Sequence, residues 1–297
     1  MMNPSNTPMT IGFSNLSEKL GFTVTVREGL QTAVAAHPHI RLLTYDNNMN
    51  NEQAMINARA FADAPVDIAI LFHLDERALP NIANVLLRKQ IPVITIDIPI
   101  APWVTYYGAN NEQAGRLVGE ALAKWIKTHW EGRVDKIVLM TEYRVLADVR
   151  KRLDYALAAV RDAIIFSPDD VLFLDSGNLR ESAAEHFAPT LARWDTFHRI
   201  AVIGFNDDTA LGALDAARAV GRENDVVVVG QGADLALNEF RQPSSRLIAS
   251  TAYFPERYGA HLLHLAQRIV AGESVPRKNY VEHQVVTPEN VESFTSS

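Results

Sequence analysis

The sequence predicts an α/β protein built from two doubly wound parallel-sheet lobes, and two observations support this. First, short apolar segments rich in Val, Ile and Leu recur along the chain, each ending in a polar residue and leading into a helical pattern. Strands buried on both faces of a parallel sheet have this composition. Second, the series of strands and helices occurs twice. Strict alternation implies parallel pairing with right-handed crossovers, so the repeat predicts two similar sheets.

The first series predicts the sheet of the first lobe. Its strands are expected at 9–15, 40–47, 67–73 and 92–97. Helical patterns alternate with them at 18–37, 51–64 and 78–90. The segment TYYGAN at 105–110 then leaves this series and leads into the second one.

The second series repeats the pattern after a long helix that opens at Asn111 and runs through Trp125, with Asn110 or Asn111 as its N-cap. Strands are expected at 136–142, 171–176, 199–207 and 226–231, and helices at 147–163, 180–194 and 208–221. A strand at 247–253, a helix at 255–272 and a last strand at 280–287 complete the chain. This late helix and strand predict that the chain crosses between the lobes more than once.

Composition excludes several classes of function. The 297 residues carry a formal net charge of −7 and no basic stripe, which argues against nucleic acid or an anionic membrane as the main partner. The absence of cysteine excludes disulfides, thiolate metal sites and a cysteine nucleophile. The first ten residues have no apolar signal core, and no segment is long enough to span a bilayer. Either the protein is cytoplasmic or an export signal has been removed.

No motif predicts catalysis, a metal or a cofactor. The sequence contains no P-loop, HExxH or GxSxG motif. Gly230-Gln231-Gly232 follows a strand, but the dinucleotide-binding pattern is incomplete. His261 and His264 share one helix face, yet no third metal ligand is evident. We therefore expect no catalytic residues and no bound cofactor.

Five segments carry a family resemblance: IPVITID (91–97), YYGANNEQAGRLVGEAL (106–122), IGFNDDTALGALDAARAVG (203–221), VVVVGQGAD (226–234) and VVTPENV (285–291). In order and spacing the chain resembles the type I periplasmic sugar-binding proteins of ABC importers, such as ribose-binding proteins. The same fold forms the effector domain of lac-repressor-type regulators. The resemblance covers residues 9 to 291.

The resemblance implies two lobes joined by a three-crossover hinge, with a sugar enclosed between them. It places crossovers near Ala109, Ala233 and Tyr253. We expect an N-terminal lobe of 9–109 and 254–279 and a C-terminal lobe of 110–253 and 280–292.

Candidate ligand-binding residues lie at or near the carboxyl ends of the strands, where open α/β sheets bind ligands. In the first lobe the resemblance implies Asp97, whose carboxylate would accept bonds from sugar hydroxyls, and Phe22, whose ring would pack on the sugar. Ile98 and Thr23 stand where the family often has an arginine and a second aromatic residue. Trp103 could supply the missing ring. Asp97 could instead cap a helix or a turn before Pro99.

In the second lobe the resemblance implies Asn206, with Asp207 as the cap of the following helix. One of Arg150 and Arg152 is expected to face the ligand, because residues two apart cannot share a helix face. Gln231 and Tyr253 stand where many relatives carry aspartate and glutamine. The full candidate set is Asn15, Phe22, Asp97, Trp103, Glu142, Arg150, Arg152, Asn206, Gln231 and Tyr253.

These observations predict a non-enzymatic, extracytoplasmic and monomeric binding protein that delivers a sugar or sugar-like solute to an ABC permease. Ligand would shift an open–closed equilibrium by hinge motion. Replacing Asp97 is expected to leave the fold intact, because strand ends contribute little core packing. Two alternatives remain open: a ligand-sensing domain of a regulator or chemotaxis system, and an enzyme on the same scaffold. A signal peptide or an upstream DNA-binding segment would distinguish the first two.

Overall fold

A computed structural model of the chain describes residues 8–144 and 147–294. The described chain divides into two compact units. Unit 1 contains the described residues up to Ala109 together with Phe254–Val281, and unit 2 contains Asn110–Tyr253 and the described residues from Glu282 onward. Both units are α/β, which confirms the predicted fold class.

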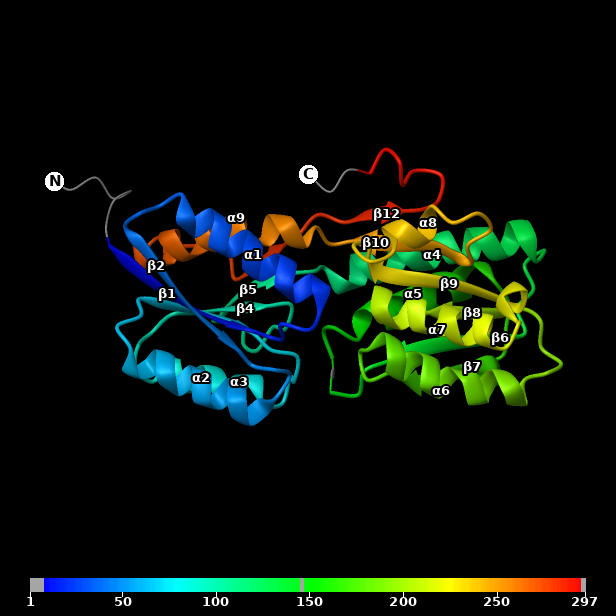
Figure 1. Cartoon of the computed structure of the whole chain (residues 1–297), viewed down its shortest axis with the longest axis horizontal. Helices are drawn as coiled ribbons and strands as arrows, with labels where there is room; N and C mark the ends of the chain where they lie inside the picture. The colour runs from blue at the N-terminus through cyan, green and yellow to red at the C-terminus, as the bar shows by residue number, and fades with distance from the viewer. Residues whose placement is uncertain (1–7, 145–146, 295–297) are drawn as a thin grey trace. The chain divides into compact units, whose positions relative to one another are not determined.

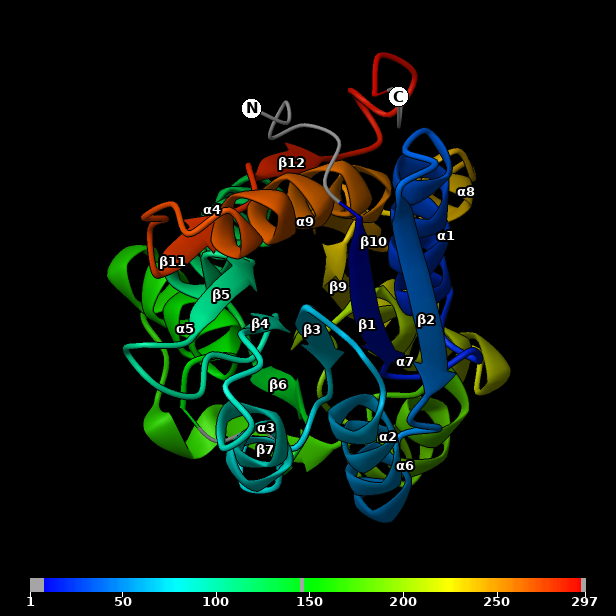
Figure 2. The same cartoon turned by 90° about the vertical axis from the view of Figure 1, so that its left-hand side faces the viewer.

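Unit 1 is a six-stranded sheet with helices on both faces. Its elements are β1 (Met9–Asn15), α1 (Gly21–Ala35), β2 (Ile40–Asp46), α2 (Asn51–Asp63), β3 (Ile68–Phe72), α3 (Leu79–Leu87), β4 (Val93–Ile96), β5 (Thr105–Gly108), α9 (Pro255–Val270) and β11 (Lys278–Tyr280). The strand order is β11-β5-β4-β3-β1-β2, as Figure 2 shows, and the described pairs are parallel. In Figure 1, α1 and α9 cover one face, and α2 and α3 cover the other.

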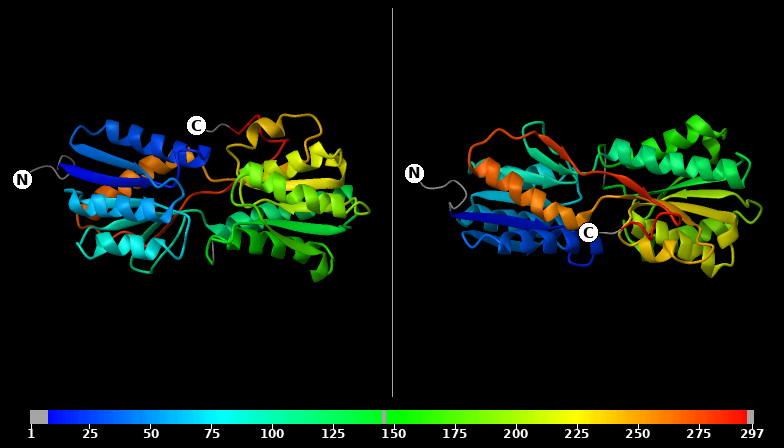
Figure 3. Two further views of the ribbon diagram at one scale, coloured as in Figure 1. Left: turned by 60° about the horizontal axis from the view of Figure 1, so that its bottom comes forward. Right: turned by 90° about the horizontal axis from the view of Figure 1, so that it is seen from above.

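The pairing of α1 with α9 completes unit 1 with a segment from late in the sequence. Figure 3 shows α9, in orange, among the blue and cyan elements of this unit. The helices meet at Gly29 and Gly259, where a Cβ built on Gly259 would lie 2.0 Å from the carbonyl carbon of Gly29. Only glycine permits this approach. Val26 and Leu30 of α1 and Leu262 of α9 are buried.

Unit 2 repeats the architecture with one difference. Its elements are α4 (Asn111–His129), β6 (Lys136–Thr141), α5 (Lys151–Ala163), β7 (Val171–Asp175), α6 (Arg180–Arg193), β8 (Ile200–Ile203), α7 (Asp207–Ala219), β9 (Val226–Gly232), α8 (Leu237–Phe240), β10 (Leu247–Ala252) and β12 (Gln284–Val286). The strand order is β12-β10-β9-β8-β6-β7. The edge strand β12 runs antiparallel to β10, whereas the other described pairs are parallel. Helix α4 packs on α5, and α6 on α7.

The C-terminal strand prediction is wrong in one respect. The single strand expected at 280–287 is two short strands, β11 and β12, which belong to different units. The N–H of Val281 donates to the carbonyl of Gly108 and closes β11, after which the chain enters unit 2. The structure also contains β5 and α8, which the sequence pattern did not predict, and α5 begins at Lys151 rather than at residue 147.

The chain passes between the units after Ala109, Tyr253 and Val281, and it does not cross near Ala233. Ala233 has a left-handed backbone with φ of 59°. Its N–H donates to Ser250 Oγ at 3.1 Å, and this bond holds the turn after β9 against β10 inside unit 2. Among the helices that the structure describes, none is both long and apolar enough to cross a membrane.

Candidate functional site

Asp97 follows β4 and connects three parts of unit 1. Its Oδ1 accepts hydrogen bonds from the N–H of Ala109, at 3.2 Å, and from the Tyr258 hydroxyl, at 3.1 Å. Burial, together with the negative charge of Asp97, holds the pKa of Tyr258 well above its usual value. A Cβ on Gly108 would lie 2.2 Å from Asp97 Oδ1, so this position requires glycine. Asp97 therefore links the ends of β4 and β5 to α9.

Phe22 and Asn15 lie in the same part of unit 1. The Phe22 ring packs edge-on against Tyr258 and Phe72, at centroid distances of 5.6 and 6.4 Å. Tyr258 thus brings Phe22 and Asp97 together. Asn15 is completely buried, and its Nδ2 donates to the carbonyl of Ser17 at 3.1 Å. Its Oδ1 has no hydrogen-bond partner among the described residues, which leaves one buried acceptor available to a ligand.

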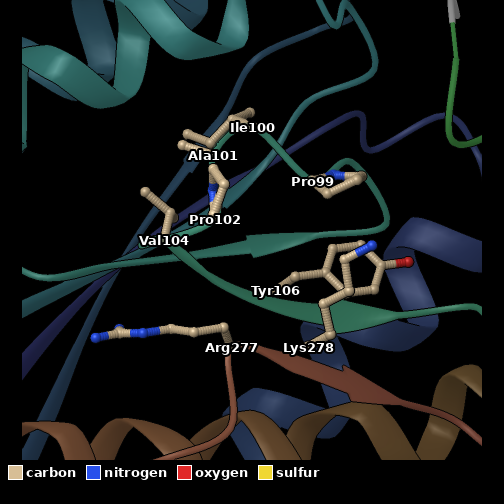
Figure 4. A pocket seen from close by; sticks show the side chains of 8 residues that line it. All are labelled: Pro99, Ile100, Ala101, Pro102, Val104, Tyr106, Arg277 and Lys278. Atoms are coloured by element: carbon tan, nitrogen blue, oxygen red, sulfur yellow. The ribbon is translucent and has the colours of Figure 1, made fainter.

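Trp103 lies on the loop between β4 and β5 and is 69% exposed. It does not contact Phe22 in any ring pair that the structure describes. The same loop borders a cavity of about 390 Å³, shown in Figure 4. The residues that line it are Pro99, Ile100, Ala101, Pro102, Val104, Tyr106, Arg277 and Lys278. No predicted ligand-binding residue lines this cavity, so we place it outside the candidate site.

Arg152 is the central charged residue of the unit 2 site. It lies on α5 and is only 6% exposed. Its Nε donates to Asn111 Oδ1 at 3.0 Å, and its Nη1 donates to the carbonyl of Phe205 at 3.3 Å. The guanidinium carbon lies 4.9 Å from the ring centroid of Phe205 and 5.1 Å from that of Tyr253. These contacts fix the side chain at the carboxyl end of the sheet.

Gln231 and Tyr253 join the same cluster. The Tyr253 hydroxyl donates to Gln231 Oε1 at 2.7 Å, and each residue is 2% exposed. Gln231 Nε2 and Asn111 Nδ2 are buried and have no hydrogen-bond acceptor among the described residues. Two amide donors are therefore available beside Arg152. Such buried, unpartnered groups are rare in folded proteins, so these two amides are candidates for a specific role.

His283 borders this cluster and is held in its neutral form. Its ring lies 5.0 Å from the Tyr253 ring, and its Nε2 accepts from the N–H of Asn110 at 2.9 Å. Burial lowers the pKa of His283 to about 4, and the positive charge of Arg152 contributes to the shift. At neutral pH the imidazole is therefore uncharged, and Arg152 supplies the positive charge of this cluster.

Asn206, rather than Asp207, caps α7, so the predicted assignment of the cap to Asp207 is wrong. Asn206 Oδ1 accepts from the N–H of Thr209 at 2.9 Å, and its Nδ2 donates to Asn178 Oδ1 at 2.7 Å. Both ends of its amide are thus engaged within unit 2. The cap is Asn206, one residue before the predicted position, because Asn206 has the extended backbone that an N-cap requires.

Asp207 is instead a buried carboxyl group behind the cap. It accepts from the Ser250 hydroxyl at 2.6 Å and from the N–H of Ala236 at 3.2 Å. Burial and the neighbouring Asp234 raise its pKa well above the usual range. Glycine at position 230 makes room for it, because a Cβ there would lie 2.5 Å from Asp207 Oδ1. This group stabilises the turn after β9.

Glu142 and Arg150 lie outside the Arg152 cluster. Glu142 is 3% exposed and accepts two bonds from the guanidinium of Arg144, at 2.9 and 2.6 Å. The side chain of Arg150 is half-exposed, pairs with Asp154 at 3.3 Å and covers the Phe173 ring. Of the two candidate arginines, Arg152 is the one that contacts another predicted site residue, Tyr253, among the residues that the structure describes.

Sequence reasoning missed three members of the cluster, namely Asn111, Phe205 and His283. Asn111 was noted only as a possible helix cap, yet Asn110 caps α4 and the side chain of Asn111 turns to Arg152. The available signal was an Asn-Asn pair at one helix start, where only one residue can cap. No comparable signal marked His283.

The described chain forms two doubly wound α/β units and passes between them three times. Buried polar groups lie near the ends of their strands. This arrangement is typical of a two-lobed ligand-binding protein. Residues 11–274 match the periplasmic binding protein domain, and the chain belongs to this family. The predicted family resemblance is confirmed. As a member of a family of binding proteins, the chain is not an enzyme.

Individual relatives are more distant. The chain is 26% identical over 217 residues to a D-ribose/D-allose-binding protein of Pseudomonas aeruginosa, a match that covers 70% of this chain and 65% of the relative. It is 24% identical over 275 residues to the ribose import binding protein of Escherichia coli, covering 89% and 86%. The solved structure of the Caulobacter myo-inositol binding protein has a TM-score of 0.81, 22% identity and 99% and 98% coverage, and it supports the fold.

Proposed function

We propose that this chain is the extracytoplasmic solute-binding component of an ABC importer and that it captures a sugar or sugar-like ligand. Family membership supports a binding role, and the names of the relatives point to ribose, allose and import. The observation that carries the proposal is the set of buried, unpartnered amide atoms on Asn15 and Gln231, near the ends of β1 and β9, and on Asn111, at the start of α4.

The chemistry of these groups suits a polyhydroxylated ligand. Asn15 offers an acceptor, while Asn111 and Gln231 offer donors, and a sugar hydroxyl can serve either role. The aromatic ring of Phe22 suits the apolar C–H face of a sugar. We propose that Asn15, Phe22, Asp97, Arg152, Gln231 and Tyr253 contribute to binding. Within the described part of each unit, Trp103 and Arg150 form no hydrogen bond, ion pair or ring contact with the members of this group in their own unit.

We further propose that ligand shifts an equilibrium between conformations that differ at the three chain crossings, and that a permease recognises the ligand-bound form. A ligand can shift such an equilibrium only by its difference in affinity for the two states. Binding by residues from both units would supply that difference. We expect the protein to act as a monomer, because one copy of the chain contains both units.

A thermal-shift screen tests the proposal. At ligand near one hundred times its dissociation constant, the folded state should gain about 2.7 kcal/mol. The panel would contain D-ribose, D-allose, myo-inositol, further pentoses and hexoses, and their acid derivatives. Gln231→Ala should reduce the shift, whereas the exposed Gln242→Ala should not change it. A panel that shifts no melting temperature would count against sugar binding altogether.

A further inference from the structure

Arg152 is a buried charge with no carboxylate partner. It is 6% exposed, and the acceptors that it contacts are the neutral oxygens of Asn111 and Phe205. No ion pair of Arg152 occurs within residues 8–144 and 147–294, and its Nη2 forms no hydrogen bond there. Arg144, which follows β6, differs because it is paired with Glu142 at 2.6 Å. A buried charge without a counter-ion is unfavourable, so this site favours an incoming anion.

The neutral groups around Arg152 also have only donors left. A guanidinium can donate but not accept, so Arg152 fixes the oxygen of Asn111 toward itself and leaves the Nδ2 group without an acceptor. The oxygen of Gln231 accepts a hydrogen bond from the Tyr253 hydroxyl, and the Nε2 group of Gln231 is also left without an acceptor. Asn111 is 3% exposed and Gln231 is 2% exposed. These two amides thus add buried donors to the cationic group.

Two buried carboxyl groups of unit 2, those of Glu142 and Asp207, are engaged by groups other than Arg152. Glu142 is engaged by Arg144, and Asp207 lies in a separate contact with Ser250 and Ala236. His283 adds no positive charge beside Arg152 at neutral pH, because burial lowers its pKa to about 4, with a smaller contribution from the charge of Arg152. The groups that Asn111, Arg152 and Gln231 can still offer a ligand are therefore donors, and one of them is charged.

We propose that unit 2 binds a carboxylate on the ligand, so that the captured solute is a sugar acid such as an aldonate or a uronate rather than a neutral sugar. This inference rests on the proposed function. A carboxylate offers two oxygens with about four acceptor sites, which match the Nη2 of Arg152 and the two amides. Arginine binds such a group with geometric specificity. A single guanidinium with neutral amides balances one negative charge, which favours a carboxylate over a phosphate dianion.

Matched pairs of ligands test this proposal by calorimetric titration of the whole chain. The probes are D-gluconate with D-glucose, D-ribonate with D-ribose, and D-galacturonate with D-galactose, with D-ribose 5-phosphate as the phosphate probe. We expect at least one acid to bind at least about tenfold more tightly than its neutral partner, which is the lower end of the range for a hydrogen bond to a charged group. Tighter binding of every neutral partner would overturn the inference and leave the proposed function standing. Binding of the phosphate alone would overturn the carboxylate assignment. If no probe and no neutral sugar of the wider panel binds, both proposals fail.

Two variants separate the charge of Arg152 from its packing. Asn111→Asp is nearly isosteric and places a carboxylate beside Arg152, so it should raise the melting temperature without ligand and weaken the acid at least about tenfold. Arg152→Gln should also weaken the acid and should abolish its advantage over the neutral partner. Arg161→Gln, on the exposed face of the same helix, is the matched control. Unchanged acid affinity in a folded Asn111→Asp protein would contradict the proposal.

Discussion

Asp97→Ala should destabilise unit 1 in the absence of any ligand. The substitution removes the acceptor of two buried donors, the Ala109 N–H and the Tyr258 hydroxyl, whose residues are 1% and 0% exposed. Each donor left unsatisfied costs about 1–3 kcal/mol, so the expected loss is about 2–6 kcal/mol. The left-handed backbone at Asp97, with φ of 58°, adds to it, because aspartate tolerates this conformation better than alanine. This expectation replaces the sequence-based one that the fold would be unaffected.

Urea unfolding followed by circular dichroism measures this loss, and a double-mutant cycle identifies its cause. Asp97→Asn keeps an acceptor and the backbone preference, so it should cost much less than Asp97→Ala. In a Tyr258→Phe background the buried hydroxyl is absent, and Asp97→Ala should then cost about 1–3 kcal/mol less than in the wild type. An Asp97→Ala protein that loses under about 1 kcal/mol, or a cycle without coupling, would refute this account.

Three further predictions concern stability. Because burial and Asp234 raise the folded-state pKa of Asp207 above its unfolded value, the folded state binds the proton more tightly, and stability should fall as pH rises from about 4 by up to about 1.4 kcal/mol per pH unit. Asp207→Asn should flatten this dependence in denaturant titrations from pH 5 to 9, and an unchanged slope would contradict the assignment. Gly259→Ala should separate α1 from α9 and cost about 1–3 kcal/mol in thermal or urea unfolding, whereas an unchanged midpoint would show that the helices can shift freely. Arg144→Met should leave the buried carboxylate of Glu142 unpaired and cost up to about 3 kcal/mol, discounted for the 27% exposure of the arginine side chain. Adding Glu142→Gln should recover most of that loss, and no recovery would exclude the unpaired charge as its cause.

The sequence pattern predicted the fold because buried parallel strands and amphipathic helices carry strong periodic signals. The apolar segment of β3, Ile68–Phe72, is buried at every position, as its composition implied. Short strands without such a signal were missed. Strand β5 has only four residues, and β11 and β12 have three each, so their pairing is decided by neighbouring strands rather than by their own composition.

The candidate site was less predictable, because hydrogen bonds between distant residues decide which polar groups remain available. Asp97 and Asn206 both stand at strand ends, yet each is engaged inside its own unit. The sequence left Arg150 and Arg152 as alternatives, and only the packing of α5 places Arg152 against Tyr253. The role of Asn111 depends on a contact with a residue 41 positions later, which no local pattern reveals.

The return of α9 and β11 to unit 1 determines when this unit can fold during synthesis of the chain. When Ala109 has been made, the apolar face of α1 still lacks its partner helix, and the edge of β5 still lacks β11. All of unit 2 up to Tyr253, and then the segment to Val281, must be translated before unit 1 can close. At roughly 5–20 residues per second, this interval is on the order of ten to thirty seconds. During that time the nascent N-terminal segment exposes an unpaired strand edge and an apolar helix face. Chaperones bind such surfaces, and we expect them to bind this segment. Unit 1 can be completed only after the segment up to Val281 has been translated.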